Sequence, residues 1–143
     1  MSTTTIEMRP AEATDLARVQ RLWEACGLAP AAADEWEALV AGPTTAVLLA
    51  TDRDELLGSA IASSDGWRAY IYHVAVAPAH RGDGLGHRLM DQAEQYLLSA
   101  GARYVYVTVQ QDNTEGLALA ASQGYLPEGE LVLVKRMATR VAQ

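Results

Sequence analysis

Residues 69–100 read AYIYHVAVAPAHRGDGLGHRLMDQAEQYLLSA, and this stretch predicts a strand, a glycine-rich turn and a helix. The segment from Tyr70 to Ala77 is mostly aromatic and β-branched, which is the composition of a buried strand. Pro78 has no backbone N–H group and therefore ends the strand. Beyond the turn, apolar residues recur every three or four positions, as in an amphipathic helix. They are Leu85, Leu89, Ala93, Tyr96, Leu97 and Ala100.

The turn carries glycines at three alternate positions, Gly82, Gly84 and Gly86. Glycine lets the backbone approach a ligand closely, and the free N–H groups at the start of the next helix attract an anion. The turn therefore predicts a phosphate or pyrophosphate site. Its spacing is neither the dinucleotide pattern G-x-G-x-x-G nor the nucleoside-triphosphate pattern G-x-x-x-x-G-K-[ST]. The alternative is a turn that only connects the strand to the helix.

The spacing R-x-x-G-x-G, formed by Arg81, Gly84 and Gly86 directly after a V-x-V-x-P strand end, resembles the coenzyme A loop of the GNAT N-acetyltransferases. A second resemblance lies further along the chain. Asn113, a predicted helix and the pair Gly124-Tyr125 follow one another there, as in many members. Within the family, the chain most resembles the small YpeA-like and ribosomal-protein-alanine-acetyltransferase-like members.

The whole chain, residues 1–143, is predicted to form one domain with the element order β-α-α-β-β-β-α-β-α-β. Three hairpin strands followed by a β-α-β crossover predict an α/β (mixed α+β) fold. Its sheet is mixed and mostly antiparallel, with helices on both faces. This order matches the GNAT acyl-CoA N-acyltransferase fold. The predicted strands are 5–9, 44–51, 56–63, 70–77, 104–110 and 131–137, and the predicted helices are 14–26, 31–41, 85–100 and 113–123.

The sequence after Gly124 has room for one strand, at residues 131–137, where many relatives have a hairpin. An open sheet edge is a site at which another chain can pair. We therefore expect a homodimer as one way to complete the sheet.

The net charge of −7, from 11 basic and 18 acidic residues without a basic stripe, argues against nucleic acid and anionic membranes as partners. The chain shows no signal peptide or apolar span and has one cysteine, Cys26, so we expect a cytoplasmic protein. Cys26 is interpreted as a small core residue, with a covalent nucleophile as the alternative. The histidines at 73, 80 and 87 fall on a strand, a loop and a helix start, so no metal site is predicted.

The resemblance implies transfer of an acetyl group from acetyl-CoA to a primary amine of a small molecule, a protein or a peptide. It implies that backbone groups of Val74, Ala75 and Val76 hold the pantetheine arm and polarise the thioester. It further implies a role for Asn113 in binding the arm, with helix capping as the alternative. Asp83 is unusual beside a pyrophosphate and is expected to face water. The implied pyrophosphate loop consists of Arg81, Gly82, Asp83, Gly84, Leu85, Gly86 and His87.

Two proton-handling residues of the family are missing. Many relatives carry a tyrosine acid seven residues after the asparagine, where this chain has Ala120. The alanine acetyltransferases carry a glutamate base five residues before it, where this chain has Thr108. Ser122 and Tyr125 are not positioned to replace the acid.

Strand alternation predicts that Tyr70 and Tyr72 share one face of the central strand with Val74 and Val76. The two tyrosines are therefore weak candidates for catalytic residues, with packing as the alternative. His73 has the opposite parity and is expected to face a helix.

The predicted function is acetyl-CoA-dependent N-acetylation of a primary amine by direct attack. The alternative is a catalytically weak acyl-CoA-binding module that acts through a partner. The first two helices, where relatives bind the acceptor, carry Asp34, Glu35 and Glu37, which favour a cationic amine. A solvated charged helix face is the alternative.

Overall fold

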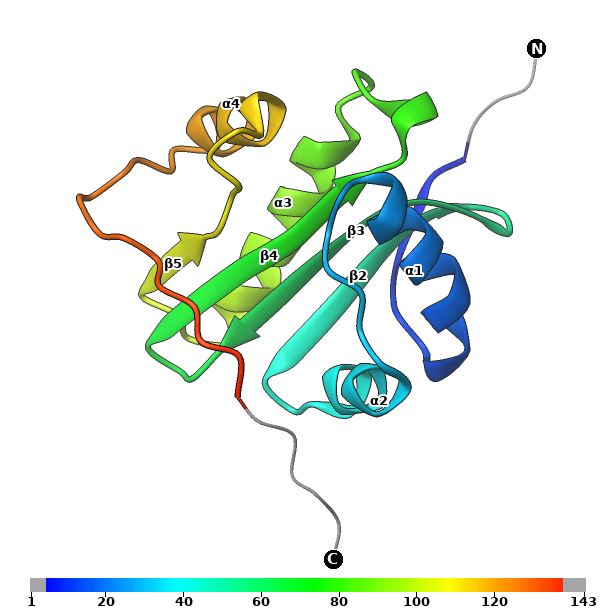
Figure 1. The fold of residues 1–143 in the computed structure, drawn as a ribbon, viewed down its shortest axis with the longest axis horizontal. Coiled ribbons are helices and arrows are strands. Elements are labelled where there is room, and N and C mark those ends of the chain that lie inside the picture. Colours follow the sequence, from blue (N-terminus) through cyan, green and yellow to red (C-terminus); the bar gives the residue numbers. More distant parts are fainter. Residues whose placement is uncertain (1–4, 138–143) are drawn as a thin grey trace, which may run out of the picture.

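The computed structural model describes residues 5–137, which form a five-stranded sheet with helices on both faces (Figure 1). The strand order follows the chain, and only the last pair of strands is parallel. The predicted mixed, mostly antiparallel sheet is therefore confirmed. The strands are β1 Glu7–Pro10, β2 Thr45–Asp52, β3 Glu55–Ser64, β4 Arg68–Val76 and β5 Tyr104–Val107.

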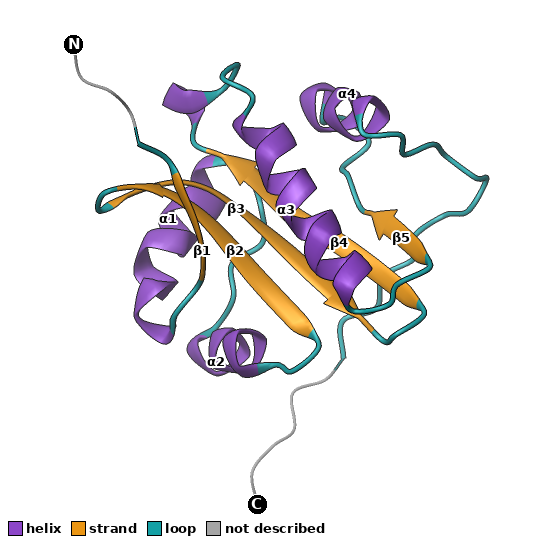
Figure 2. Ribbon diagram, turned by 180° about the vertical axis from the view of Figure 1, so that it is seen from behind, coloured by secondary structure: helices purple, strands orange, loops and turns teal. Residues whose placement is uncertain are grey.

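The helices α1 Leu16–Ala25 and α2 Ala33–Ala41 cover one face of the sheet, and α3 Leu85–Ser99 covers the other (Figure 2). The helix α4 Thr114–Ser122 lies beside the start of α3. Short 3-10 turns at Ala13–Asp15 and Pro78–His80 precede α1 and α3. None of the described helices has the length and apolar character needed to cross a membrane.

Each face of the sheet has its own apolar core. Beneath α1 and α2, Trp23 and Trp36 meet edge to face with their centroids 6.0 Å apart, against inward-facing residues of β2 and β3. Beneath α3 on the other face, Met90 and Leu97 pack on Ala62 and Ile71. Leu89 packs there on Leu57 and Ala60 of β3. The 3.6-residue period of the helices and the two-residue period of the strands produce this division.

A β-bulge in β4 overturns the predicted alternation. Ser59 pairs with Ala75 and Ile61 pairs with Tyr72, so His73 and Val74 together oppose one residue of β3. The extra residue shifts the side-chain parity. Tyr72 therefore packs on the face that α1 and α2 cover, whereas Val74 packs beneath α3. The prediction that Tyr70, Tyr72, Val74 and Val76 share one face is wrong for this reason.

The predicted final strand at 131–137 is also wrong. The structure assigns no strand there, and the apolar side chains of this segment are between 72% and 89% exposed. An extended segment becomes a strand only when a neighbour supplies ladder hydrogen bonds, and within residues 5–137 no strand pairs with the outer edge of β5. The homodimer that was expected to complete this edge stays a prediction.

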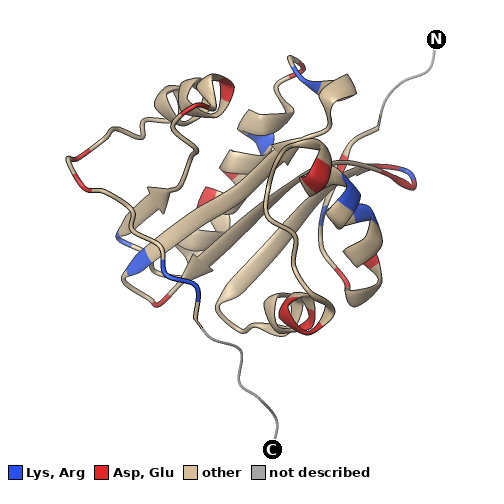
Figure 3. Ribbon diagram, in the orientation of Figure 1, with Lys and Arg blue, Asp and Glu red and all other residues tan. Residues whose placement is uncertain are grey.

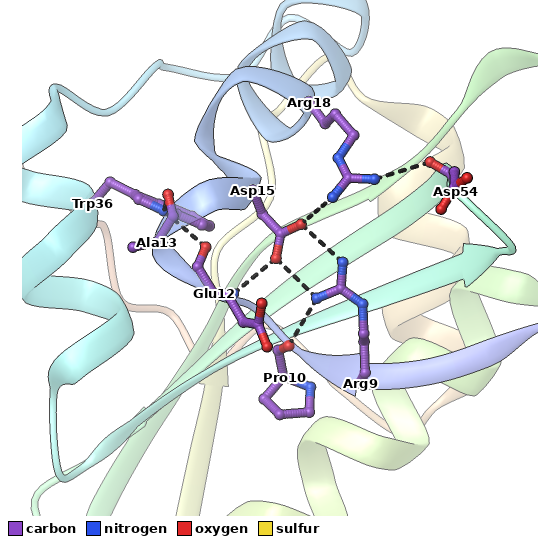
Figure 4. Close-up of polar contacts among 8 residues, drawn as sticks. All are labelled: Arg9, Pro10, Glu12, Ala13, Asp15, Arg18, Trp36 and Asp54. Carbon is purple, nitrogen blue, oxygen red and sulfur yellow. Dashed lines mark hydrogen bonds and ion pairs between the residues drawn. The ribbon is translucent and has the colours of Figure 1, made fainter.

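The connection between β1 and α1 is built around the buried carboxylate of Asp15 (Figure 4). Arg9 donates two hydrogen bonds of 2.8 Å to it, and Arg18 donates one of 2.7 Å. The backbone N–H of Glu12 donates another, and the indole of Trp36 donates to the carbonyls of Glu12 and Ala13. This network fixes α1 and α2 relative to the edge of the sheet.

Candidate functional site

The central strand is open along half of one edge. β4 pairs with β5 only from Arg68 to Ile71, and the last contact is the N–H of Thr108 with the carbonyl of Ile71 at 3.3 Å. From Tyr72 to Val76 the strand keeps β3 on one side and has no second strand among the described residues. The two strands thus separate where the family resemblance implies the thioester, and unpaired backbone groups lie there.

The carbonyl of Val76 also lies on this open edge, but side chains already occupy it. The N–H of Ala77 donates to β3 at 2.8 Å, so the carbonyl of the same peptide group points away from β3. It accepts hydrogen bonds from Nε of Arg81 at 3.2 Å and from Sγ of Cys26 at 3.5 Å. Cys26 is half-buried against the core beneath α1, as its interpretation as a small core residue requires.

The glycine-rich turn leaves the start of α3 uncovered. Gly82 and Gly84 have φ angles of +90° and +78°, which L side chains rarely adopt. A Cβ atom at either glycine would meet no heavy atom within 4 Å, so the space in front of the helix is free. No side chain caps the first N–H groups of α3, and Asp83 is exposed, as expected. The turn therefore fits a bound diphosphate.

Gly86 has a packing role in addition. A Cβ atom there would lie 2.9 Å from a methyl carbon of Leu119, so glycine is needed for α3 to approach α4. Arg81 reaches toward the same helix, with its guanidinium 3.8 Å from the carboxylate of Glu115. Asn113 caps α4, because its Oδ1 accepts the N–H of Gly116 at 2.9 Å. The role of Asn113 toward a pantetheine arm stays a prediction.

An open pocket of 510 Å³ lies between α1, α2 and the bulged part of β4. Its lining is mostly aromatic and aliphatic, and Glu35 is its only carboxylate; Asp34 and Glu37 do not line it. One oxygen of Glu35 accepts the N–H of Ala32 at 2.7 Å. Of the three acidic residues expected to favour a cationic amine, only Glu35 therefore lines the pocket. The lining residues are Trp23, Ala29, Pro30, Ala31, Glu35, Ala38, Leu39, Thr45, Ile61, Tyr72 and His73.

The structure separates the two candidate tyrosines. Tyr72 lines the pocket, and burial raises the pKa of its hydroxyl, so the phenol stays neutral and acts as a hydrogen-bond donor or acceptor. Tyr70 is 44% exposed and stacks on Tyr106 with a centroid distance of 5.3 Å, outside the pocket. Of the two tyrosines, only Tyr72 therefore lines this pocket.

The positions of the missing acid and base hold no proton carrier. Ala120 is buried on α4, and Thr108 is exposed beyond the end of β5. Ser122 donates to the carbonyl of Leu119, within its own helix. Tyr125 donates to Glu94 at 2.9 Å, and burial together with this carboxylate raises the pKa of its hydroxyl far above the usual range. Neither side chain is free to act as an acid.

His73 is the functional candidate that sequence reasoning missed. Alternation directs it toward a helix, and it does meet Trp23 of α1, at a centroid distance of 4.6 Å. Because of the bulge, however, it lines the same pocket as Tyr72. Its only sequence signal is a histidine three residues before the V-x-P strand end. Among the described residues, no group of three His, Cys, Asp or Glu side chains could hold a metal ion.

Comparison with known proteins gives one family. Residues 11–125 match the model of the acetyltransferase (GNAT) family. A putative acetyltransferase from Agrobacterium tumefaciens is 17% identical with a TM-score of 0.76, over 91% of this chain and 99% of that one. An aminoglycoside acetyltransferase from an uncultured soil metagenomic sample, in complex with sisomicin, is 19% identical with a TM-score of 0.77, over 94% and 97%. The aminoglycoside N-acetyltransferase AAC(6')-Iy in complex with CoA is 16% identical with a TM-score of 0.78, over 96% and 98%.

Proposed function

Because the chain belongs to the GNAT acetyltransferase family, it is an acetyltransferase that uses acetyl-CoA, and we propose that its acceptor is a primary amine with an apolar body. The observation that carries this proposal is the pocket beside the β4 bulge, which combines an aromatic and aliphatic lining with one carboxylate. Apolar pockets of this size bind small molecules through buried surface and a few placed polar groups.

The proposed roles follow from the open edge of β4 and the turn beyond it. Backbone groups of Val74, Ala75 and Val76 on the open edge hold the pantetheine arm and polarise the thioester carbonyl. The N–H groups from Gly82 to His87 receive the diphosphate at the start of α3. The amine nitrogen then attacks the carbonyl carbon directly and the sulfur of CoA departs. No acylated enzyme forms in this scheme, and proximity supplies much of the acceleration.

The lining also selects among amines. An ammonium group is attracted to the carboxylate of Glu35, whereas the rest of the acceptor meets Leu39, Ile61 and Trp23. A heavily hydroxylated amine would lose hydrogen bonds to water there without replacing them. We therefore expect arylalkyl and alkyl amines to be better acceptors than amino sugars. Sisomicin, which is bound by the similar enzyme from the soil metagenome, is an example of an amino sugar.

The first prediction is an order of acceptors. CoA release from acetyl-CoA should be fastest with arylalkyl or alkyl amines, slower with peptides that have a free N-terminus, and slowest with amino sugars. The measurement is the rate of thiol release over a matched panel. An amino sugar as the best acceptor would contradict the apolar class. If no amine in the panel supported turnover, the binding-module alternative would replace the enzyme proposal.

A lysine in the pocket tests the same site. Ala38 is exposed on α2 and lines the pocket, whereas Ala41 is exposed on the same helix outside it. Ala38→Lys should raise the acceptor KM about tenfold, because the added ammonium repels the substrate and fills space. Ala41→Lys is the control and should leave KM unchanged. Equal effects of both variants would remove the pocket from the proposal.

A further prediction concerns the glycine-rich turn. Gly84→Ala should lower the affinity for acetyl-CoA about tenfold, because the side chain alters the turn that presents the N–H groups to the diphosphate. Gly66→Ala is the matched control, since Gly66 also has a positive φ (+94°) and no heavy atom near its Cβ position. Both variants should lose similar stability on thermal unfolding. Equal acetyl-CoA affinities in titration calorimetry would count against a diphosphate site in this turn.

A further inference from the structure

The bulge residue His73 has an unusual backbone conformation. Its φ is +50°, and Arg53 is the only other described residue besides glycine with a positive φ. Such conformations persist where surrounding contacts hold them, and they concentrate at functional sites. Here the carbonyl of His73 accepts the hydroxyl of Ser59 at 3.0 Å, and Ser59 in turn accepts the indole N–H of Trp23 at 2.9 Å. Ser59 and Trp23 are both buried, so the bulge is rigidly held.

The imidazole ring of His73 is also fixed in place. Its Nε2 lies 2.9 Å from the carbonyl oxygen of Ala29, in the connection between α1 and α2. The ring meets Trp23 at an interplanar angle of 81° and Tyr72 at 84°. Segments from three parts of the chain thus orient one ring at the wall of the pocket.

The contact with Ala29 determines which nitrogen can accept a proton. A carbonyl oxygen only accepts hydrogen bonds, so Nε2 must carry the hydrogen. In the neutral ring, Nδ1 then holds the free lone pair. No hydrogen bond to Nδ1 is formed by the described residues, whereas the Nε2 contact is made. In histidines that act as bases, a hydrogen bond to one ring nitrogen likewise decides which of the two nitrogens carries the hydrogen.

We propose that Nδ1 of His73 is the base that removes the proton from the attacking amine. This inference rests on the proposed function, because it assumes an amine in the pocket. As the nitrogen forms its bond to the thioester carbon, the carbon–sulfur bond breaks and the electron pair leaves with sulfur. The surplus proton of the nitrogen passes to Nδ1, and water protonates the CoA thiolate. The imidazolium then returns its proton to water, so the products are the amide and free CoA.

The position of His73 supports this role over that of the other polar groups in the pocket. It lies two residues beyond Ile71, where β4 loses its pairing with β5, and next to Val74 on the unpaired edge. The other titratable groups of the pocket lining are Tyr72 and Glu35. The phenol of Tyr72 has a raised pKa and is a poor base at neutral pH, and one oxygen of Glu35 caps α2.

His73→Gly is the decisive variant, because glycine adopts a φ of +50° without strain and leaves a space that imidazole can enter. We expect kcat to fall about a hundredfold, with the affinity for acetyl-CoA and the melting temperature retained. Added imidazole should raise the kcat of this variant at least about tenfold. His73→Asn, which also tolerates a positive φ but has no basic nitrogen, should be equally slow and gain nothing from imidazole.

Arg53→Gly is the matched control, because Arg53 also has a positive φ (+57°) but lies in the turn between β2 and β3, outside the pocket. It should keep the wild-type kcat and gain nothing from imidazole. A folded His73→Gly variant with a kcat within about threefold of wild type would overturn the proposal. A loss that imidazole does not restore would also overturn it, because the ring would then act only by packing. A wild type without amine-dependent turnover would contradict the proposed function itself, which separates the two failures.

Discussion

Asp15→Ala is expected to lower the free energy of unfolding by about 3 kcal/mol. Asp15 is 1% exposed, and its carboxylate receives hydrogen bonds from Arg9, Arg18 and the N–H of Glu12. Removing it leaves that N–H without its acceptor, and the two guanidinium groups keep only their hydrogen bonds to the carbonyls of Pro10 and Asp54. The side chains of Arg9 and Arg18 are 27% and 36% exposed, so water solvates both guanidinium groups when the carboxylate is removed. The loss of stability should therefore lie at the lower end of the range for a broken buried ion pair.

Urea-induced unfolding of Asp15→Ala and of Arg18→Met measures this difference. Arg18→Met removes one of the four hydrogen bonds to the carboxylate and keeps those from Arg9 and Glu12, so it should cost only about 1 kcal/mol. Equal costs for the two variants would contradict a network centred on the carboxylate.

The same carboxylate predicts a pH dependence of stability. Hydrogen bonds from Arg9, the N–H of Glu12 and the charges of both arginines lower the pKa of Asp15 from 3.8 to about 2, against the effect of burial. A lowered pKa in the folded state means that the stabilisation is present above pH 4 and is lost as the pH falls from about 4 toward 2. It amounts to about 2 kcal/mol. The difference in stability between wild type and Asp15→Ala should shrink over that range.

This network lies far along the chain from the glycine-rich turn, yet it bears on the pocket that we propose for the acceptor. Trp36 donates to the carbonyls of Glu12 and Ala13, next to Asp15, and α2 contributes Glu35, Ala38 and Leu39 to the pocket. Loosening the β1–α1 connection therefore moves one wall of the pocket. Asp15→Ala should consequently raise the acceptor KM more than the KM for acetyl-CoA.

The sequence predicted the elements whose signals are local. The turn at Gly82 and Gly84, the amphipathic face of α3 and the cap at Asn113 each depend on a few neighbouring residues, and all three are present. The parallel pairing of β4 with β5 followed from the predicted β-α-β order of this part of the chain. These features needed no knowledge of distant contacts.

The features that failed depend on partners far away in the chain. The run from Tyr70 to Val76 has the composition of an unbroken strand, and nothing in it marks the bulge that Ser59 and Trp23 hold in place. The segment 131–137 has the composition of a strand but no ladder partner among the described residues. The expected acidic cluster at 34–37 has the same origin. The composition of the helix could not show that Glu35 lines the pocket and Asp34 does not.

Ala120→Tyr is expected to raise kcat about tenfold to a hundredfold, with the affinity for acetyl-CoA nearly unchanged. Ala120 occupies the position at which the family resemblance implies a tyrosine hydroxyl near the departing sulfur. A positioned general acid contributes about 10²–10⁴ in rate, or roughly 3–5 kcal/mol. A thiol with a pKa near 8.5 leaves fairly well unaided, so the gain should lie at the lower end of that range.

Ala120→Phe is the matched control, because it fills the same space without a hydroxyl and should bring no gain. Ala120 is 9% exposed, so the larger ring must find room among the residues that bury this position. Stopped-flow measurement of CoA release, with titration of acetyl-CoA, gives kcat and the cofactor Kd for each variant. If both tyrosine and phenylalanine lowered binding and turnover, the space beside Ala120 would already be filled. A gain from tyrosine alone would identify proton delivery to sulfur as the step that this chain leaves to water.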